Sequence, residues 1–338
     1  KAAADAVGEF GLADRMRGDA MPTTPLVEPL FFQRLLQEKV WGGFALAERL
    51  GINLPFAGPL GETWELSDCP GQETIIAGGP FGGTSLRELM ETHSAEILGD
   101  SRPTHDGRFP LLVKFLDATD DLSVQVHPPD GLAPGAGVGK TEAWFVLNDG
   151  GSVISGLEAG TQAKSFSEHA HTAEVEGDLH EIGVRRGDCV FVPAGQTHAI
   201  RSGTMLCEIQ QTSDVTYRLY DWGRLGLDGK PRATHLKEAL RVVDYSLPPG
   251  EAVRGECAEN LLVVCPYFRM RSFRLNADQI LGIESHTHAR VMAVVGGSGQ
   301  MAGRELKFGD TFLLPASLEM VSIQASGDGL EIVEAEAL

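Results

Sequence analysis

The sequence is poor in the features that would assign it to a membrane, a nucleic acid or an oxidising compartment. No apolar run approaches the ~20 residues that span a bilayer, and the N-terminus lacks the basic-then-apolar order of a secretory signal. Lys and Arg number 28 against 47 Asp and Glu, which gives a formal net charge of −19; such a surface repels phosphate backbones. The five cysteines contain no CxxC pair. We therefore expect a cytoplasmic protein with free thiols that binds neither membranes nor nucleic acids.

The length of the chain and one stretch rich in Pro, Gly and charged residues predict two domains after a short leader. A chain of 338 residues is enough for roughly two domains of typical size. Residues 1–20 are rich in Ala, Gly and Asp without periodicity, so we expect a loose leader before Met21. A stretch rich in Pro, Gly and charge at 245–256 predicts the linker. The predicted domains are 21–245 and 246–338.

Short β-branched runs separated by Gly, Pro, Asn and Asp predict a mainly β protein built as an antiparallel sandwich or barrel. The clearest runs are FPLLVKFLDA, TEAWFVLND, DCVFVPAG, MLCEIQQT and DTFLLPAS. Helical periodicity predicts two decorating helices, one at 85–99 with Ser85 as N-cap and Gly99 as its end, and one at 234–244.

Two segments of equal length share one frame. GDCVFVPAGQTH at 187–198 and GDTFLLPASLEM at 309–320 both read Gly-Asp-x-x-Phe/Leu-x-Pro-Ala. The repeat predicts two weakly similar copies of one β-barrel unit.

The first copy contains a candidate metal ligand. Its sequence GDCVFVPAGQTHAI fits G-x5-P-x-G-x2-H, a spacing that resembles the second motif of cupin barrels. A lone strand His such as His198 is more often a satisfied core residue than a ligand. Other ligand types precede it, however. In LSVQVHPPD, Gln125 and His127 share one strand face, and Glu142 follows in GKTEAWFVL. Two imidazoles, a carboxylate and an amide oxygen suit a borderline divalent ion such as Zn²⁺ and leave room for a substrate oxygen.

The second copy offers a poorer ligand set. His286 and His288 provide two imidazoles, but Met320 stands where His198 stands and Ser317 replaces the turn glycine. Since no carboxylate follows closely, we expect this unit to be structural and without metal.

Five segments resemble type I mannose-6-phosphate isomerases of the short bacterial kind: GETWELSD, LLVKFLDATDDLSVQVHPPD, GKTEAWFVL, VPAGQTHAI and EIQQTSDVTYRLYDWGR. The resemblance runs from about Glu38 to about Leu240. It implies two cupin-type antiparallel jelly-roll barrels with a few helices. It also implies a zinc-dependent aldose–ketose isomerase, with one zinc ion per chain, that interconverts D-mannose 6-phosphate and D-fructose 6-phosphate through an enediol.

The resemblance assigns roles residue by residue. The zinc ligands are Gln125, His127, Glu142 and His198, the set already reached from ligand chemistry. The predicted catalytic residues are Arg218 in SDVTYR, Lys140 before the Glu ligand, and Glu208 in CEIQQ. The predicted substrate-binding residues are Ser123, Lys114, Glu62, Trp41 and Asp214.

Several of these residues also have a purely structural interpretation. Glu208 is our candidate proton shuttle, or else a salt-bridged structural acid. Arg218 could contact the phosphate, stabilise the charged intermediate, or simply pair with Asp214 or Asp221. Lys114 lies in an apolar strand, where a Lys is costly unless it is paired or functional.

Two other function classes fit a cupin. One is a different metal-dependent cupin enzyme, such as an iron oxygenase or an epimerase. The other is a non-catalytic sugar-sensing cupin, which would have lost ligands or Arg218; here all are present. Ile200 stands where larger relatives have a Tyr, which leaves the proton route open. We expect a monomer or small homo-oligomer with a small-molecule phosphosugar as its partner.

Overall fold

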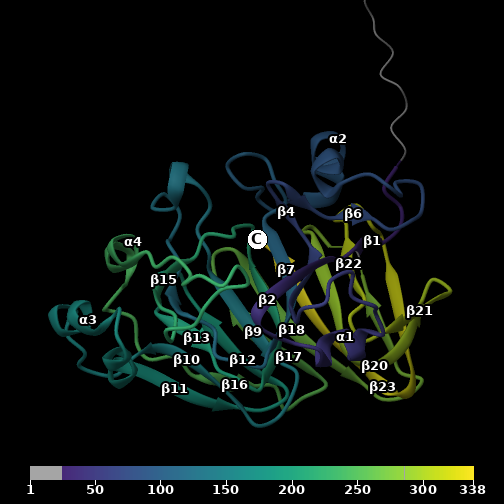
Figure 1. The fold of residues 1–338 in the computed structure, drawn as a ribbon. Coiled ribbons are helices and arrows are strands. Elements are labelled where there is room, and N and C mark those ends of the chain that lie inside the picture. Colours follow the sequence, from purple (N-terminus) through teal and green to yellow (C-terminus); the bar gives the residue numbers. More distant parts are fainter. Residues whose placement is uncertain (1–24, 285) are drawn as a thin grey trace, which may run out of the picture.

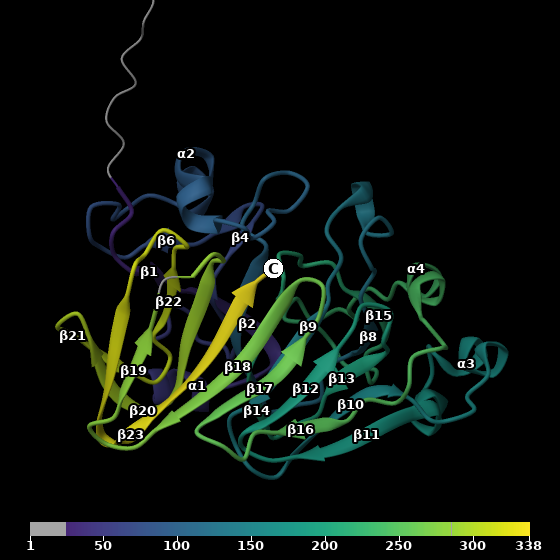
Figure 2. The same ribbon diagram turned by 180° about the vertical axis from the view of Figure 1, so that it is seen from behind.

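The computed structural model describes residues 25–284 and 286–338, so the predicted leader 1–20 lies outside the described residues. The protein is mainly β, and its sheets are antiparallel throughout (Figures 1 and 2). The nine-stranded sheet contains β1 (Leu30–Gln33), β6 (Ile75–Ile76), β17 (Glu259–Val264), β18 (Phe268–Leu275), β19 (Ile280–Ile283), β20 (Arg290–Met301), β21 (Arg304–Lys307), β22 (Thr311–Leu314) and β23 (Val321–Ala337).

Two further sheets form the other half of the molecule. The seven-stranded sheet contains β2 (Leu35–Gly43), β3 (Leu60–Leu66), β7 (Leu111–Ala118), β9 (Glu142–Val146), β12 (Asp188–Val192), β14 (Thr204–Gln211) and β16 (Ala252–Arg254). The five-stranded sheet contains β8 (Val124–Val126), β10 (Gly151–Leu157), β11 (Leu179–Val184), β13 (His198–Ile200) and β15 (Tyr217–Tyr220). A small hairpin pairs β4 (Asp68–Cys69) with β5 (Gln72–Glu73).

Among the described residues, the strand orders run from one edge strand to another. The mainly β class is therefore confirmed, whereas closure into two jelly-roll barrels stays a prediction. The domain division stays a prediction too; β1, from the N-terminal range, pairs with β22 in the C-terminal sheet.

The helices lie at the periphery (Figure 1). They are α1 (Ala45–Leu50), α2 (Leu86–Leu98), α3 (Ala163–His169) and α4 (Leu236–Val242), with short 3₁₀ turns at Pro134–Ala136 and Ala173–Asp178. The predicted helices at 85–99 and 234–244 are confirmed as α2 and α4. The sequence did not locate α1 and α3 individually, because they have six and seven residues and are too short to show a clear period.

The strand alternation directs the two faces of the seven-stranded sheet to different cores. In β7, Val113 and Phe115 belong to the large core shared with the nine-stranded sheet, while Leu116 belongs to the core shared with the five-stranded sheet. Lys114, between Val113 and Phe115 in the sequence, faces the same side as Leu116 because side chains alternate along a strand. In β14, Glu208 faces that side for the same reason. The polar residues of this inner face line the candidate site.

The sequence repeat corresponds to one repeated turn. Gly187 and Gly309 take φ values of 85° and 87°, a region that favours glycine. The carboxylates of Asp188 and Asp310 each accept the backbone N–H three residues upstream, at 3.0 and 2.9 Å. The Gly-Asp frame therefore forms the same strand-entry turn in both copies.

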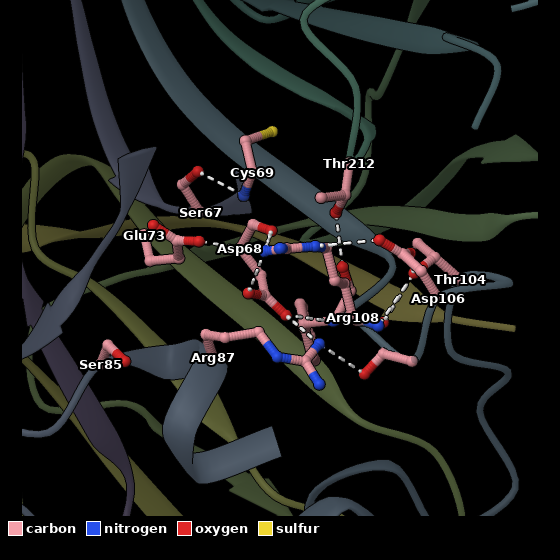
Figure 3. Close-up of polar contacts among 12 residues, drawn as sticks. Ser67, Asp68, Cys69, Glu73, Ser85, Arg87, Thr104, Asp106, Arg108 and Thr212 are labelled. Carbon is pink, nitrogen blue, oxygen red and sulfur yellow. Dashed lines mark hydrogen bonds and ion pairs between the residues drawn. The ribbon is translucent and has the colours of Figure 1, made fainter. Parts of the chain in front are cut away.

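A polar cluster fastens α2 and the segment after it to the small hairpin (Figure 3). Ser85 and Glu88 form a reciprocal capping box at the start of α2. The Asp68 carboxylate accepts the backbone N–H of Phe109 at 2.8 Å and the Arg108 guanidinium at 3.2 Å. Arg87 of α2 reaches the same carboxylate at 3.8 Å.

All five cysteines are free, and four of them are buried. Within residues 25–284 and 286–338, none of the helices is long and apolar enough to cross a membrane.

Candidate metal centre and active site

Three side chains predicted as ligands converge in the interior. The donor atoms of His127, Glu142 and His198 all lie within 4.8 Å of one another, and each residue is at most 1% exposed. Glu142 begins β9, His198 begins β13, and His127 follows β8 directly. The Nε2 atoms of the two histidines are 3.1 Å apart, and each lies 3.4 Å from a Glu142 oxygen.

Hydrogen bonds to the backbone fix the tautomer of both imidazoles. Nδ1 of His127 lies 2.9 Å from the carbonyl oxygen of Val215, and Nδ1 of His198 lies 2.8 Å from that of Gln196. Because a carbonyl oxygen only accepts, each Nδ1 carries the hydrogen and donates. Burial lowers the pKa of both imidazoles, that of His127 to about 3, so both rings are neutral. Two Nε2 lone pairs therefore face each other and Glu142.

Such an arrangement of donor atoms can hold a metal cation. Neither oxygen of the buried Glu142 accepts a well-formed hydrogen bond from the part of the chain that the structure describes. Burial would raise the pKa of this carboxyl, but the ammonium of Lys140 holds it well below its usual range. Nζ of Lys140 lies 3.0 Å from Glu142 Oε2 and 3.0 Å from His127 Nε2. One carboxylate and two imidazole lone pairs held by backbone carbonyls fit a divalent metal of the zinc type.

A tight turn places His198. The PAG segment after β12 turns at Gly195, whose φ is 89°. The backbone N–H of Gly195 donates to the carbonyl of His127 at 2.9 Å. A side chain at Gly195 would come within 3.1 Å of the carbonyl oxygen of Val242. The cupin-like spacing thus ties two ligands together through the backbone.

Gln125 lies beside this cluster. It pairs in register with His198 of β13 on one side and with Arg218 of β15 on the other. Ser123 accepts a hydrogen bond from Nε of Arg218 at 3.2 Å, and Nη1 of Arg218 donates to the carbonyl of Ala233 at 2.7 Å. Burial, followed by repulsion from nearby cations, lowers the pKa of Arg218.

Asp221 is occupied by other cations. Its carboxylate accepts the Nε atoms of Arg232 at 2.7 Å and of Arg224 at 3.1 Å. The structural pairing considered for Arg218, with Asp214 or Asp221, does not occur among the described residues.

A pocket of about 280 Å³ opens beside the cluster. The predicted catalytic and substrate-binding residues all line it: Trp41, Glu62, Lys114, Ser123, Lys140, Glu208, Asp214 and Arg218. Gln125 and Ile200 line it as well. Lys140 connects the pocket to the cluster, because it lines the wall and contacts both Glu142 and His127.

Lys114 is buried between carboxylates in this wall. Its ammonium lies 3.3 Å from Glu208 and 4.0 Å from Glu62, and 4.7 Å from the centre of the Trp64 ring. Burial alone would lower the pKa of Lys114, but these two carboxylates raise it. The cost of burying this Lys in an apolar strand is therefore offset by ion pairs.

The pKa values of the two carboxyl groups are shifted in opposite directions. Burial and then repulsion from Glu142 raise the pKa of Glu208, whose Oε2 accepts the indole N–H of Trp144 at 3.1 Å. Burial would raise the pKa of Glu62 also, but Lys39 and Lys114 lower it to about 2. Of the two groups, Glu208 therefore has the higher pKa and binds a proton more readily than Glu62. This property suits a group that transfers protons.

The sequence interpretation missed several pocket residues, which are Lys39, Leu116, Leu122, Thr216, Arg232 and His235. His235 accepts the backbone N–H of Arg218 through Nδ1 at 3.2 Å. The only signal for Arg232 and His235 was a basic pair, PRATH, just before the predicted helix at 234–244.

A larger cavity of about 380 Å³ lies beside residues 130–138 of the loop that ends in Lys140. Its wall holds Arg102, His105, Asp130 and Tyr267 but none of the ligand cluster. The smaller pocket is the candidate active site because it adjoins the buried donors.

Comparisons with known proteins agree with this geometry. Residues 30–138 match the family model for the catalytic domain of type I phosphomannose isomerase. The chain is 35% identical over 308 residues to the mannose-6-phosphate isomerase ManA of Bacillus subtilis, covering 86% of this chain and 94% of that protein. It is 33% identical to the mannose-6-phosphate isomerase of Streptococcus mutans, covering 91% of this chain and 98% of the relative.

A solved structure is similar along nearly its whole length. The crystal structure of the mannose 6-phosphate isomerase from Bacillus subtilis superposes with a TM-score of 0.79 at 30% identity. The match covers 91% of this chain and 99% of that one.

Proposed function

Because this chain belongs to the type I mannose-6-phosphate isomerase family, and is an aldose–ketose isomerase, we propose that it interconverts D-mannose 6-phosphate and D-fructose 6-phosphate through an enediol with the help of one zinc ion. One observation supports the metal in this proposal. In a buried cluster, the Nε2 lone pairs of two neutral imidazoles point towards the Glu142 carboxylate.

His127, Glu142 and His198 would hold the ion, with Gln125 beside them as the fourth ligand. A divalent ion at this position supplies Lewis-acid stabilisation of the negative charge that develops at the C1–C2 oxygens of the sugar. The carbonyls of Val215 and Gln196 keep both Nε2 lone pairs directed at the cluster, so the site is preorganised.

Glu208 moves the proton between C2 and C1 in our proposal. It lines the pocket and is buried, and its raised pKa brings proton release closer to neutral pH. Lys114 pairs with its carboxylate at 3.3 Å and favours the ionised form. The indole of Trp144 fixes the other oxygen, so Glu208 presents one orientation to the pocket.

Cations hold the anionic substrate, which an acidic protein of net charge −19 would otherwise repel. Arg218 and Lys140 both line the pocket. The hydroxyl of Ser123 binds Nε of Arg218 and so orients its guanidinium towards the substrate. Trp41, Glu62 and Asp214 complete the sugar-binding wall in this proposal.

A coupled assay with mannose 6-phosphate tests the proposal directly. Activity should disappear after exhaustive chelation and return when zinc is added at one equivalent per chain. Full activity in protein shown by metal analysis to be metal-free would refute the metal mechanism. Absence of isomerisation in zinc-loaded protein would refute the substrate.

A further inference from the structure

The loop between β8 and β9 carries two site residues, Lys140 and Glu142, at its end. At the end of this loop, the backbone N–H groups of residues 139–141 each donate a hydrogen bond to a defined acceptor. The N–H of Gly139 donates to Oδ1 of Asp130 at 2.7 Å. The next two N–H groups donate to the carbonyl of Pro128 at 3.0 Å and to Oε1 of Gln211 at 2.9 Å. The loop end is therefore fixed residue by residue.

Asp130 and Gln211 act as one unit. Nε2 of Gln211 donates to the same Oδ1 of Asp130 at 3.1 Å, so that one oxygen accepts two hydrogen bonds. Gln211 also ends β14, and its backbone N–H donates to the carbonyl of Thr141 at 3.1 Å. At Gly139 the backbone packs so closely that a side chain would lie 2.5 Å from the N atom of Asp130. The pair thus clamps the loop end against the C-terminal end of β14, an interior strand of the seven-stranded sheet.

Tyr267 supplies a third member from the C-terminal half. It lies in the turn between β17 and β18, and its carbonyl accepts the backbone N–H of Leu338 at 3.0 Å. Tyr267, Asp130 and Gln211 all line the larger cavity. Burial and then the Asp130 carboxylate raise the pKa of this phenol to about 12, so the hydroxyl keeps its proton.

We propose that Asp130, Gln211 and Tyr267 are positioning residues for the isomerase, which set the place of Lys140 and Glu142 by clamping the loop end between β14 and the C-terminal unit. The proposal rests on the site roles given above for Lys140 and Glu142. None of the three clamp residues contacts the ligand atoms. They act through the loop backbone, and the C-terminal unit thereby takes part in catalysis although its own copy of the motif lacks the downstream His.

Asp130→Ala and Asp130→Asn separate positioning from simple stability. The alanine variant leaves the Gly139 N–H and the Gln211 amide unpaired, whereas asparagine retains an oxygen acceptor. We expect Asp130→Ala to lower kcat by roughly 10- to 100-fold, as for other residues that orient metal ligands. We expect Asp130→Asn to stay within about threefold of the wild type, since the acceptor is kept.

Asp310→Ala is the matched control. Asp310 also holds a backbone N–H, that of Lys307 at 2.9 Å, but in a turn of the C-terminal sheet. Its loss should lower the melting temperature without lowering kcat. Equal kcat in Asp130→Ala and Asp310→Ala, each measured well below its melting temperature, would overturn the proposal.

Tyr267→Phe tests the contribution of the C-terminal unit to the clamp. Because it keeps the aromatic ring, this variant can still test the proposal if Asp130→Ala does not fold. It should lower kcat by at least roughly threefold, with a melting temperature close to that of the wild type. Unchanged kcat would remove Tyr267 from the clamp. His198→Ala and Lys140→Met, assayed in parallel, distinguish failure of the proposed site roles from failure of the positioning proposal. If those variants stay active, the site roles fail; if they are inactive while Asp130→Ala is not, only the positioning fails.

Discussion

Removing metal from this protein should lower its melting temperature by several degrees, and His198→Ala should erase that difference. In the folded chain, the Nε2 atoms of His127 and His198 lie 3.1 Å apart with both lone pairs facing inward. A bound cation satisfies both nitrogens and Glu142, and no such cluster persists in an unfolded chain. Metal binding is therefore coupled to folding.

The magnitude follows from mass action. At a free metal concentration about 1,000 times Kd, an ion that binds only the folded state stabilises it by about 4.1 kcal/mol. The entropy of unfolding is about 2.1 cal/mol/K per residue, or about 0.7 kcal/mol/K for a chain of 338 residues. The expected shift is therefore about 6 °C.

Thermal unfolding should be followed with zinc-loaded and chelated samples of the wild type, His198→Ala and His286→Ala. His286 is a buried His in the C-terminal unit, bonded through Nδ1 to the carbonyl of Glu284 at 3.2 Å. Its removal should leave both the zinc-dependent shift and the zinc content intact. Equal shifts in His198→Ala and the wild type would refute the assignment of the metal to this cluster.

Four further predictions address the site and the fold. Arg218→Ala should keep its zinc by metal analysis yet lose about 100-fold in kcat, because a preorganised charge facing the substrate is lost; loss of zinc would show that Arg218 supports the ligands instead. The kcat/KM of the wild type should fall as the pH drops through the raised pKa of Glu208, since only the ionised carboxylate can accept the proton. Lys114→Met removes the cation 3.3 Å from Glu208 and should move this acid limb to higher pH; a limb that moves to lower pH would contradict the ion-pair argument. Ser85→Ala breaks the cap of α2 and should cost about 1 kcal/mol, or 1–2 °C, with kcat unchanged.

The strands that carry the site residues could be predicted from the sequence because apolar and polar side chains alternate clearly along them. Alternation in β7 separates Lys114 from the apolar residues on either side of it, and the same period in β8 puts Gln125 and His127 on one face. Residue chemistry then selected Glu142 and His198, and the structure brings both to His127. Local pattern and ligand type were sufficient for the cluster.

Contacts set by tertiary packing could not be predicted in the same way. Arg232 and His235 come from a loop without periodicity, and only the return of that loop over β15 brings them to the pocket. The pairing of Asp130 with Gln211 joins residues 81 positions apart, and no spacing rule connects them. Tyr267 comes from the turn between β17 and β18, two strands of the nine-stranded sheet. Each depends on the complete fold rather than on a local segment.

The pairing of β1 with β22 has a consequence for how the chain folds. Leu30 lies opposite Leu313 and Phe31 opposite Phe312, so the first half of β1 finds its partner near the other end of the sequence, while its second half pairs with β6. Closing a loop of this length costs on the order of 5 kcal/mol of chain entropy before any contact compensates. During synthesis, these apolar residues must wait until nearly the whole protein has left the ribosome. The nine-stranded sheet is therefore expected to complete late, and the waiting strand to be the segment that most needs protection from aggregation.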